Sequence, residues 1–113
     1  MPTNHLIPLA EAEEMTKRYR NMNETILAST FKNRQILPTC ETFSREAFDR
    51  ILLQVGCEKV RIYFGMDDND LIKLVMVGVN EEDEDMLPAN DPVIIENGFR
   101  CPIQCPPSSV LNS

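Results

Sequence analysis

The residues with the clearest chemical potential are two cysteines in the segment C-P-I-Q-C, which occupies positions 101–105. Two thiols separated by three residues can bind one metal ion together or close a small disulfide loop. Prolines within and after the segment stiffen its backbone and remove amide donors. Cys101 and Cys105 are therefore candidates for a metal or redox site, and the simpler alternative is two partly buried thiols packed on the fold.

The other cysteines give weak support to a zinc site. A structural zinc ion has four ligands, commonly in two close pairs. Cys40 and Cys57 are 17 residues apart, and the one histidine, His5, lies near the other end of the chain. Cys57 is expected in the core, and Cys40 either in the core or at the surface. The sequence predicts no cofactor.

No residue is predicted to be catalytic. His5 has no evident partner with which it could act as an acid–base catalyst. The four glycines are too scattered for a phosphate-binding loop, and the patterns G-x-S-x-G and H-E-x-x-H do not occur in the sequence. These observations favour a non-enzymatic protein.

Acidic charge is concentrated late in the chain. The 113 residues carry a net charge of -7, to which residues 1–66 contribute +1 and residues 67–113 contribute -8. Five consecutive acids stand out: Glu81, Glu82, Asp83, Glu84 and Asp85. Such a run is usually a solvated loop of charges that repel one another. Its functional alternative is a surface that binds a basic protein.

A small anion pocket is a third candidate site. The alternation of residues over 60–64 predicts a strand with one buried face, and Arg61 and Tyr63 lie on its other face. Arg100 could join them to bind an anion. The commoner alternative is that these long side chains extend along the edge of the sheet.

Helices are predicted in the first half of the chain. Apolar residues at three- and four-residue steps predict a helix over 8–22, and a shorter one is expected over 24–34. Ser44 is a favourable N-cap for the next helix. Phe43 and Phe48 lie at the two positions of a hydrophobic staple around that start.

Strands follow the helices. Alternating and continuous apolar runs predict strands over 60–64, 71–79 and 93–95, and a turn over 97–98 could lead 99–101 back against the last of them. Helices before strands favour one α+β domain over 1–113, with an acidic loop over 80–92 and an irregular tail over 106–113. We expect a small antiparallel sheet of about three strands, covered on one face by two or three N-terminal helices. Its unpaired edges make a homo-oligomer a further expectation.

The composition argues against two classes of partner. The longest stretch without a polar side chain, 74–79, has six residues, whereas a membrane-spanning helix needs about 20. The net charge of -7 argues against nucleic-acid binding, which depends on Lys and Arg. The first ten residues lack the features of a signal peptide, so a cytoplasmic location is predicted, where thiols are kept reduced.

Several segments occur in a familiar order: Ile7–Ala12, Gln54–Cys57, the strand R-I-Y-F over 61–64, the strand V-M-V-G-V over 75–79 and the tail C-P-x-x-C. In this order they resemble a family of small uncharacterised bacterial proteins of about this length. The resemblance spans nearly the whole chain. It implies a single bacterial, cytoplasmic domain, and it implies no activity, ligand or catalytic residue.

Three functions are compatible with these observations. The first is a non-enzymatic accessory or protein-interaction domain whose acidic loop meets an unidentified, basic partner. The second is a thiol-based metal or redox site at Cys101 and Cys105. The third is an immunity-type inhibitor of a basic toxin, because such proteins are small and acidic.

Overall fold

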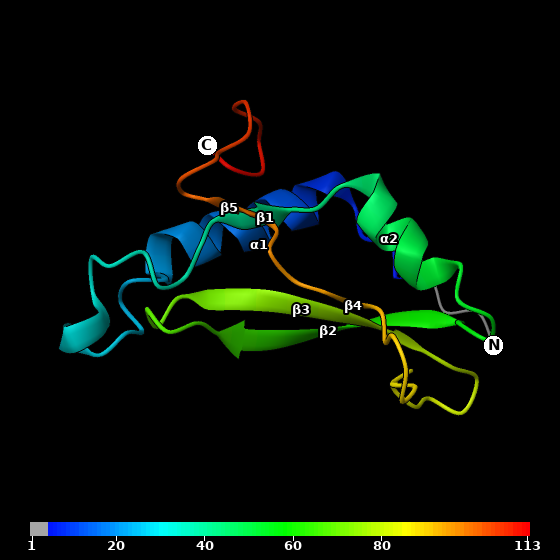
Figure 1. Cartoon of the computed structure of the whole chain (residues 1–113). Helices are drawn as coiled ribbons and strands as arrows, with labels where there is room; N and C mark the ends of the chain where they lie inside the picture. The colour runs from blue at the N-terminus through cyan, green and yellow to red at the C-terminus, as the bar shows by residue number, and fades with distance from the viewer. Residues whose placement is uncertain (1–4) are drawn as a thin grey trace.

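A computed structural model describes residues 5–113 and contains two α-helices, one 3-10 turn and five strands. In chain order these are α1 (Leu9–Met22), η1 (Ser29–Phe31), β1 (Cys40–Thr42), α2 (Arg45–Leu52), β2 (Lys59–Met66), β3 (Ile72–Val79), β4 (Ile94–Ile95) and β5 (Phe99–Cys101). The strands form two antiparallel sheets, β1–β5 and β2–β3–β4. Figure 1 shows α1, α2 and the β1–β5 pair on one side of the three-stranded sheet. The architecture is α+β, as predicted.

The β2–β3 hairpin is the centre of the molecule. Its strands pair over their full length, from Lys59 opposite Val79 to Met66 opposite Ile72. The turn between them is held by Asp67, whose Oδ1 accepts the backbone N–H groups of residues 69 and 71 at 2.9 and 3.0 Å. Met76 and Val79 of β3 are almost fully buried. The predicted antiparallel hairpin is therefore confirmed, whereas the face of β2 that was expected to be buried exposes Ile62 and Phe64.

The local signals at the start of α2 are also confirmed. Ser44 Oγ accepts the N–H of Ala47 at 3.3 Å, as an N-cap does. The rings of Phe43 and Phe48 meet edge to face at 6.4 Å between centroids, which completes the staple. These contacts direct Ile51 into the core, where its side chain is fully buried.

Helices do not cover one face of the sheet as fully as predicted. Only η1 forms in the segment 24–34, and α1 contributes no buried residue. The helical contact with β2, β3 and β4 comes from α2. Ile62, Phe64 and Met66 remain exposed on β2. Among the described helices, none is long and apolar enough to cross a membrane.

The prediction for β5 is wrong in one respect, because this strand pairs with β1 and not with β4. Asn97 adopts a left-handed conformation with φ of 66°, which redirects the chain between β4 and β5. No strand was predicted over Cys40–Thr42, since three residues carry little periodicity. The tail 106–113 contains no helix or strand, and Arg20 of α1 donates hydrogen bonds to the main-chain oxygens of Leu111 and Ser113.

Candidate functional site

Cys101 and Cys105 form a disulfide that closes a small loop after β5. Their Cα atoms are 4.6 Å apart, and the N–H of Gln104 donates to the carbonyl of Arg100 at 2.9 Å inside the same turn. The two residues differ in exposure, because Cys101 is 7% exposed and Cys105 lies at the surface. Among residues 5–113, no group of three or more His, Cys, Asp or Glu side chains is arranged to hold a metal ion.

A third cysteine lies beside this disulfide. In the β1–β5 pair, Cys40 is directly opposite Cys101. Directly opposed residues of antiparallel strands have Cα atoms about 4.5–5.5 Å apart and side chains on the same face. Cys40 is a half-buried free thiol. Three of the four cysteines, separated by up to 65 residues in the sequence, therefore gather in one place.

The fourth cysteine is elsewhere. Cys57 Sγ donates a weak hydrogen bond to the carbonyl of Lys59 at 3.4 Å, at the start of β2. It also packs against Gly78 of β3, where an added Cβ would lie 3.1 Å from the sulfur. Gly78 is four residues along β3 from Leu74, whose N–H binds a side chain of β1. At about 3.3 Å per residue, the points at which Cys57 and the β1–β5 pair contact β3 are about 13 Å apart.

Two opposed side chains fasten the β1–β5 pair to the edge of β3. Glu41 Oε1 accepts the N–H of Leu74 at 3.0 Å, while its Oε2 is buried with no hydrogen-bond partner in the described part of the chain. Arg100 Nε donates to the carbonyl of Ile72 at 3.2 Å. Arg100 Nη2 donates to two further carbonyls, those of residues 35 and 36, at 2.7 and 2.6 Å. The backbone on both sides of Cys40 and Cys101 is thereby held in place.

This role of Arg100 corrects the predicted anion pocket. Arg61 is opposite Val77 in the hairpin, five residues along β3 from the Ile72 carbonyl that binds Arg100. At about 3.3 Å per residue, the two contact points are about 16 Å apart. Tyr63 lies on the same face of β2 as Arg61, because residues two apart along a strand share a face. The structure therefore brings Arg61 and Tyr63 together but not Arg100.

Arg61 and Tyr63 bind carboxylates of the chain itself. Asp83 Oδ1 lies 2.8 Å from both Lys59 Nζ and Arg61 Nη2. Asp85 Oδ1 lies 2.6 Å from Arg61 Nη1, and its Oδ2 accepts a hydrogen bond from the Tyr63 hydroxyl. The residues expected to take an external anion are thus already occupied by the acidic loop.

These contacts move the pKa values of the groups involved. The hydrogen bond and charge of Lys59 hold the pKa of Asp83 below its usual value, with a further contribution from Arg61. The hydrogen bond from Tyr63, followed by that from Arg61, lowers the pKa of Asp85. The same bond to Asp85 raises the pKa of the Tyr63 phenol. The cluster therefore favours ionised carboxylates and a protonated tyrosine.

The acidic loop begins with a compact turn, and residues 81–84 are exposed. Asn80 Oδ1 accepts the N–H groups of Glu82 and Glu84 at 3.0 and 2.9 Å, and the N–H of Asn80 donates to the carbonyl of Glu84 at 3.0 Å. Val79 and Asp85 then form a β-bridge. Glu81, together with the side chains of Glu82 and Glu84, remains exposed, while Asp83 and Asp85 are engaged in ion pairs. The loop therefore keeps an exposed acidic surface, in which Asp83 and Asp85 also form ion pairs with β2 and Glu84 Oε1 accepts a hydrogen bond from Asn80 Nδ2 at 3.0 Å.

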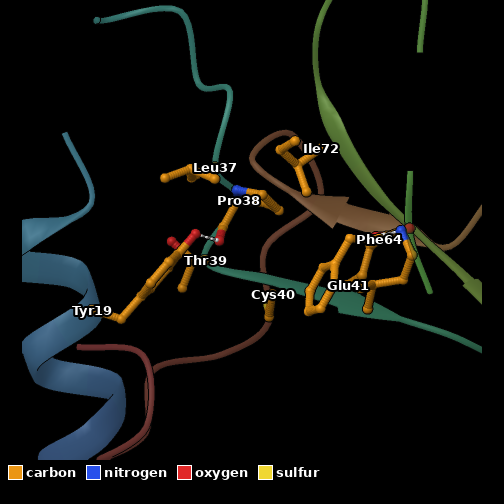
Figure 2. A pocket seen from close by; sticks show the side chains of 9 residues that line it. Tyr19, Leu37, Pro38, Thr39, Cys40, Glu41, Phe64 and Ile72 are labelled. Atoms are coloured by element: carbon orange, nitrogen blue, oxygen red, sulfur yellow. Dashed lines mark hydrogen bonds between the residues drawn. The ribbon is translucent and has the colours of Figure 1, made fainter. Parts of the chain in front are cut away.

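A cavity of about 280 Å³ lies between α1, the segment 37–41 and the β2–β3 hairpin. Its walls are mainly apolar and include Phe64 and Leu74, together with the thiol-bearing Cys40 (Figure 2). Tyr19 closes one side, and its hydroxyl donates to the carbonyl of Pro38 at 2.6 Å. Burial raises the pKa of the Tyr19 phenol. Cys40 therefore lines this cavity and is also paired with β5.

Sequence reasoning identified Cys101 and Cys105 but not Cys40 as part of a common site. The spacing of 101 and 105 is a local signal, whereas the pairing of β1 with β5 joins segments about 60 residues apart. Comparison of the chain with models of protein families, with curated proteins and with solved structures found no match in any of the three. The resemblance to a family of small bacterial proteins therefore stays a prediction.

Proposed function

We propose that the protein is a redox-responsive protein whose Cys101–Cys105 disulfide is reversibly reduced by external thiols. The observation that carries the proposal is the unequal exposure of the two bonded cysteines: Cys105 is an exposed residue, while Cys101 is 7% exposed. Thiol–disulfide exchange requires direct access of the attacking thiolate to a sulfur. The outer sulfur provides that access, and the inner one is held by the fold.

The exchange balances with a low-molecular-weight thiol as the reductant. Its thiolate attacks Cys105 Sγ and forms a mixed disulfide, and Cys101 leaves as a thiolate that takes up a proton. A second external thiol then releases Cys105 and leaves as the external disulfide. A cytoplasmic location, which stays a prediction, would suit this function because thiol buffers are abundant there.

The small size of the loop supports reversibility. Closing a five-residue loop stabilises a fold by about 2 kcal/mol, less than half of what a 100-residue loop contributes. The β1–β5 pair also has attachments that do not depend on the disulfide, namely the hydrogen bonds of Glu41 and Arg100 to the edge of β3. Reduction should therefore free residues 102–105 while β5 stays in place.

A redox titration of the native, full-length protein tests the proposal. The protein is equilibrated in glutathione buffers of set ratio, and free thiols are counted by the gel shift of a maleimide polymer. We expect a midpoint above about −300 mV, the upper limit typical of structural disulfides. Cys57→Ser should leave the midpoint unchanged, and Cys40→Ser/Cys105→Ser, which leaves Cys101 without a neighbouring thiol, should abolish the transition. A midpoint below that limit, or reduction only after unfolding, would refute the proposal.

The two interaction functions, an accessory domain and an immunity-type inhibitor, stay predictions. A basic partner, whether of an accessory domain or of an immunity-type inhibitor, would meet Glu81, Glu82 and Glu84, because Asp83 and Asp85 are paired within the chain. Charge neutralisation of the three glutamates should then weaken partner recovery at low salt. Unchanged recovery would argue against the acidic loop as the contact.

A further inference from the structure

We infer that Cys40 is an internal partner of the disulfide: its thiolate attacks Cys101, forms a cross-strand Cys40–Cys101 disulfide and releases Cys105 as a free thiol. This inference rests on the proposed redox function and names the residue that regulates it. It adds a second disulfide state to the protein, which the protein can reach without an external partner.

The β1–β5 register supplies the geometry. Cys40 and Cys101 are directly opposed, so their Cα atoms are expected about 4.5–5.5 Å apart with both side chains on one face. Disulfides form between residues whose Cα atoms are about 4.4–6.8 Å apart. Cys101 already bonds Cys105 across 4.6 Å. Cys101 therefore bonds Cys105 and lies directly opposite Cys40, so its exchange of partners requires no change in the pairing of the two strands.

The fold holds this arrangement firmly. Glu41 follows Cys40, and Arg100 precedes Cys101, and both side chains bind the backbone of β3. The N–H of Thr39 donates to the carbonyl of Cys101 at 2.9 Å, which adds a contact on the other side of Cys40. The cysteine pair is thus bracketed by hydrogen bonds. By contrast, the released cysteine, Cys105, lies in an exposed loop that can move away.

The step conserves atoms and electrons. Cys40 loses its proton, and its sulfur lone pair forms the bond to Cys101 Sγ. The bond between Cys101 and Cys105 breaks, and Cys105 leaves with the electron pair and takes up a proton. One thiol and one disulfide are present before and after, so no oxidant or reductant is consumed.

The exchange would change what the protein presents to its surroundings. Before it, the free thiol is the half-buried Cys40 and the disulfide closes a short loop. After it, the free thiol is the exposed Cys105, and the new disulfide joins β1 to β5. A larger closed loop constrains the unfolded chain more. The isomer should therefore combine a more reactive surface thiol with a more stable fold.

Trapping the native, full-length protein tests the inference. Disulfide-containing protein is held without added oxidant or reductant, alkylated with N-ethylmaleimide, and mapped by mass spectrometry under non-reducing conditions. We expect two species, one alkylated at Cys40 and one alkylated at Cys105 with a Cys40–Cys101 disulfide. Cys40→Ser should abolish alkylation of Cys105, and Cys57→Ser should leave it unchanged. Absence of the second species would overturn the inference.

A second pair of variants tests the geometry directly. Cys105→Ser leaves Cys40 and Cys101 as the neighbouring thiols, and glutathione disulfide should oxidise them to an intramolecular bond. The matched control, Cys40→Ser/Cys105→Ser, offers only the distant Cys57 and should form none. Equal oxidation of the two variants would refute the inference. If the wild-type disulfide is reduced by glutathione while Cys40 never pairs with Cys101, the inference fails and the proposed function stands.

Discussion

At the scale of single residues, Asp83 and Asp85 attach the acidic loop to β2. Their carboxylates bind Lys59, Arg61 and Tyr63, which share one face of β2. Part of the loop's charge therefore holds the turn onto the sheet. The sign of each pKa shift follows from these contacts and defines the pH range in which they act.

The cluster should be intact between mildly acidic and strongly alkaline pH. The folded pKa values of Asp83 and Asp85 are lowered, so their contribution is present above the unfolded value of about 3.9 and is lost as pH falls through the folded values. The folded pKa of Tyr63 is raised, so its contribution is present below about 10 and is lost as pH rises through the folded value.

Alkaline titration of the phenol absorbance at 295 nm measures the coupling of Tyr63 to Asp85. In a Tyr19→Phe background, which leaves one tyrosine, Asp85→Asn should shift the midpoint toward the ordinary value, because it removes the carboxylate that stabilises the protonated phenol. Glu81→Gln is the matched control, since Glu81 is an exposed acid of the same loop. An equal midpoint in Tyr19→Phe and Tyr19→Phe/Asp85→Asn would contradict the assigned contact.

At the scale of elements, Arg100 attaches β5 to β3 and to the segment 35–36. One guanidinium serves three carbonyls, those of residues 35, 36 and 72, and it is part-buried. Lysine keeps the charge but lacks the planar fork that reaches several acceptors at once. The attachment of β5, and with it the position of Cys101, therefore depends on arginine in particular.

Substitution of Arg100 should weaken the fold measurably. Arg100→Ala removes charged hydrogen bonds and leaves carbonyls unpaired, which lowers the free energy of unfolding by about 2–3 kcal/mol. Arg100→Lys should recover part of this loss. Urea unfolding measures both, with Arg45→Ala as the control at an exposed arginine of α2. If Arg100→Ala is as stable as the control, Arg100 does not fasten the sheets.

At the scale of the whole molecule, β2 is the edge of the three-stranded sheet. The N–H groups of Ile72 and Leu74 in β3 bind partners outside the hairpin. Since the direction of backbone groups alternates along antiparallel strands, the residues opposite them, Met66 and Phe64, direct theirs toward the open edge. In the described part of the chain no strand pairs with this edge, and the Phe64 side chain is 80% exposed.

This edge is complementary to itself, and we propose that a second copy of the chain pairs with it. An antiparallel pairing centred on Tyr63 aligns Ile62 with the second copy's Phe64, and Val60 with the second copy's Met66. Apolar side chains then meet on one face of the ladder. Exposed strand edges of this kind readily pair with another chain.

Sedimentation measures this association. The wild type should form a dimer, and Phe64→Lys should shift it to a monomer, because a charge would then lie inside the paired edge. Val55→Lys is the matched control, since Val55 is an equally apolar residue that is 99% exposed away from the strand. A wild-type monomer at high concentration would rule out pairing through β2.

Much of the fold could be predicted wherever the signal is local. Ser44 with its flanking phenylalanines marked the start of α2, and alternation marked the β2–β3 hairpin. The predicted grouping of Arg100 with Arg61 and Tyr63 was wrong. The position of the Arg100 side chain depends on carbonyls distant in the sequence, which no local pattern indicates. The ion pairs of Asp83 and Asp85 could likewise not be predicted from the sequence, because the turn at Asn80 decides which acids face the sheet.

The sequence by itself determined the helices α1 and α2, the central hairpin and the closeness of Cys101 to Cys105, since periodicity, caps and short spacing act between near neighbours. Only the tertiary structure decided that Cys40 faces Cys101. A strand of three residues is too short for its sequence pattern to indicate which strand it pairs with. Its pairing is selected by hydrogen bonds from Glu41 and Arg100 to β3, which exist only once the chain has folded.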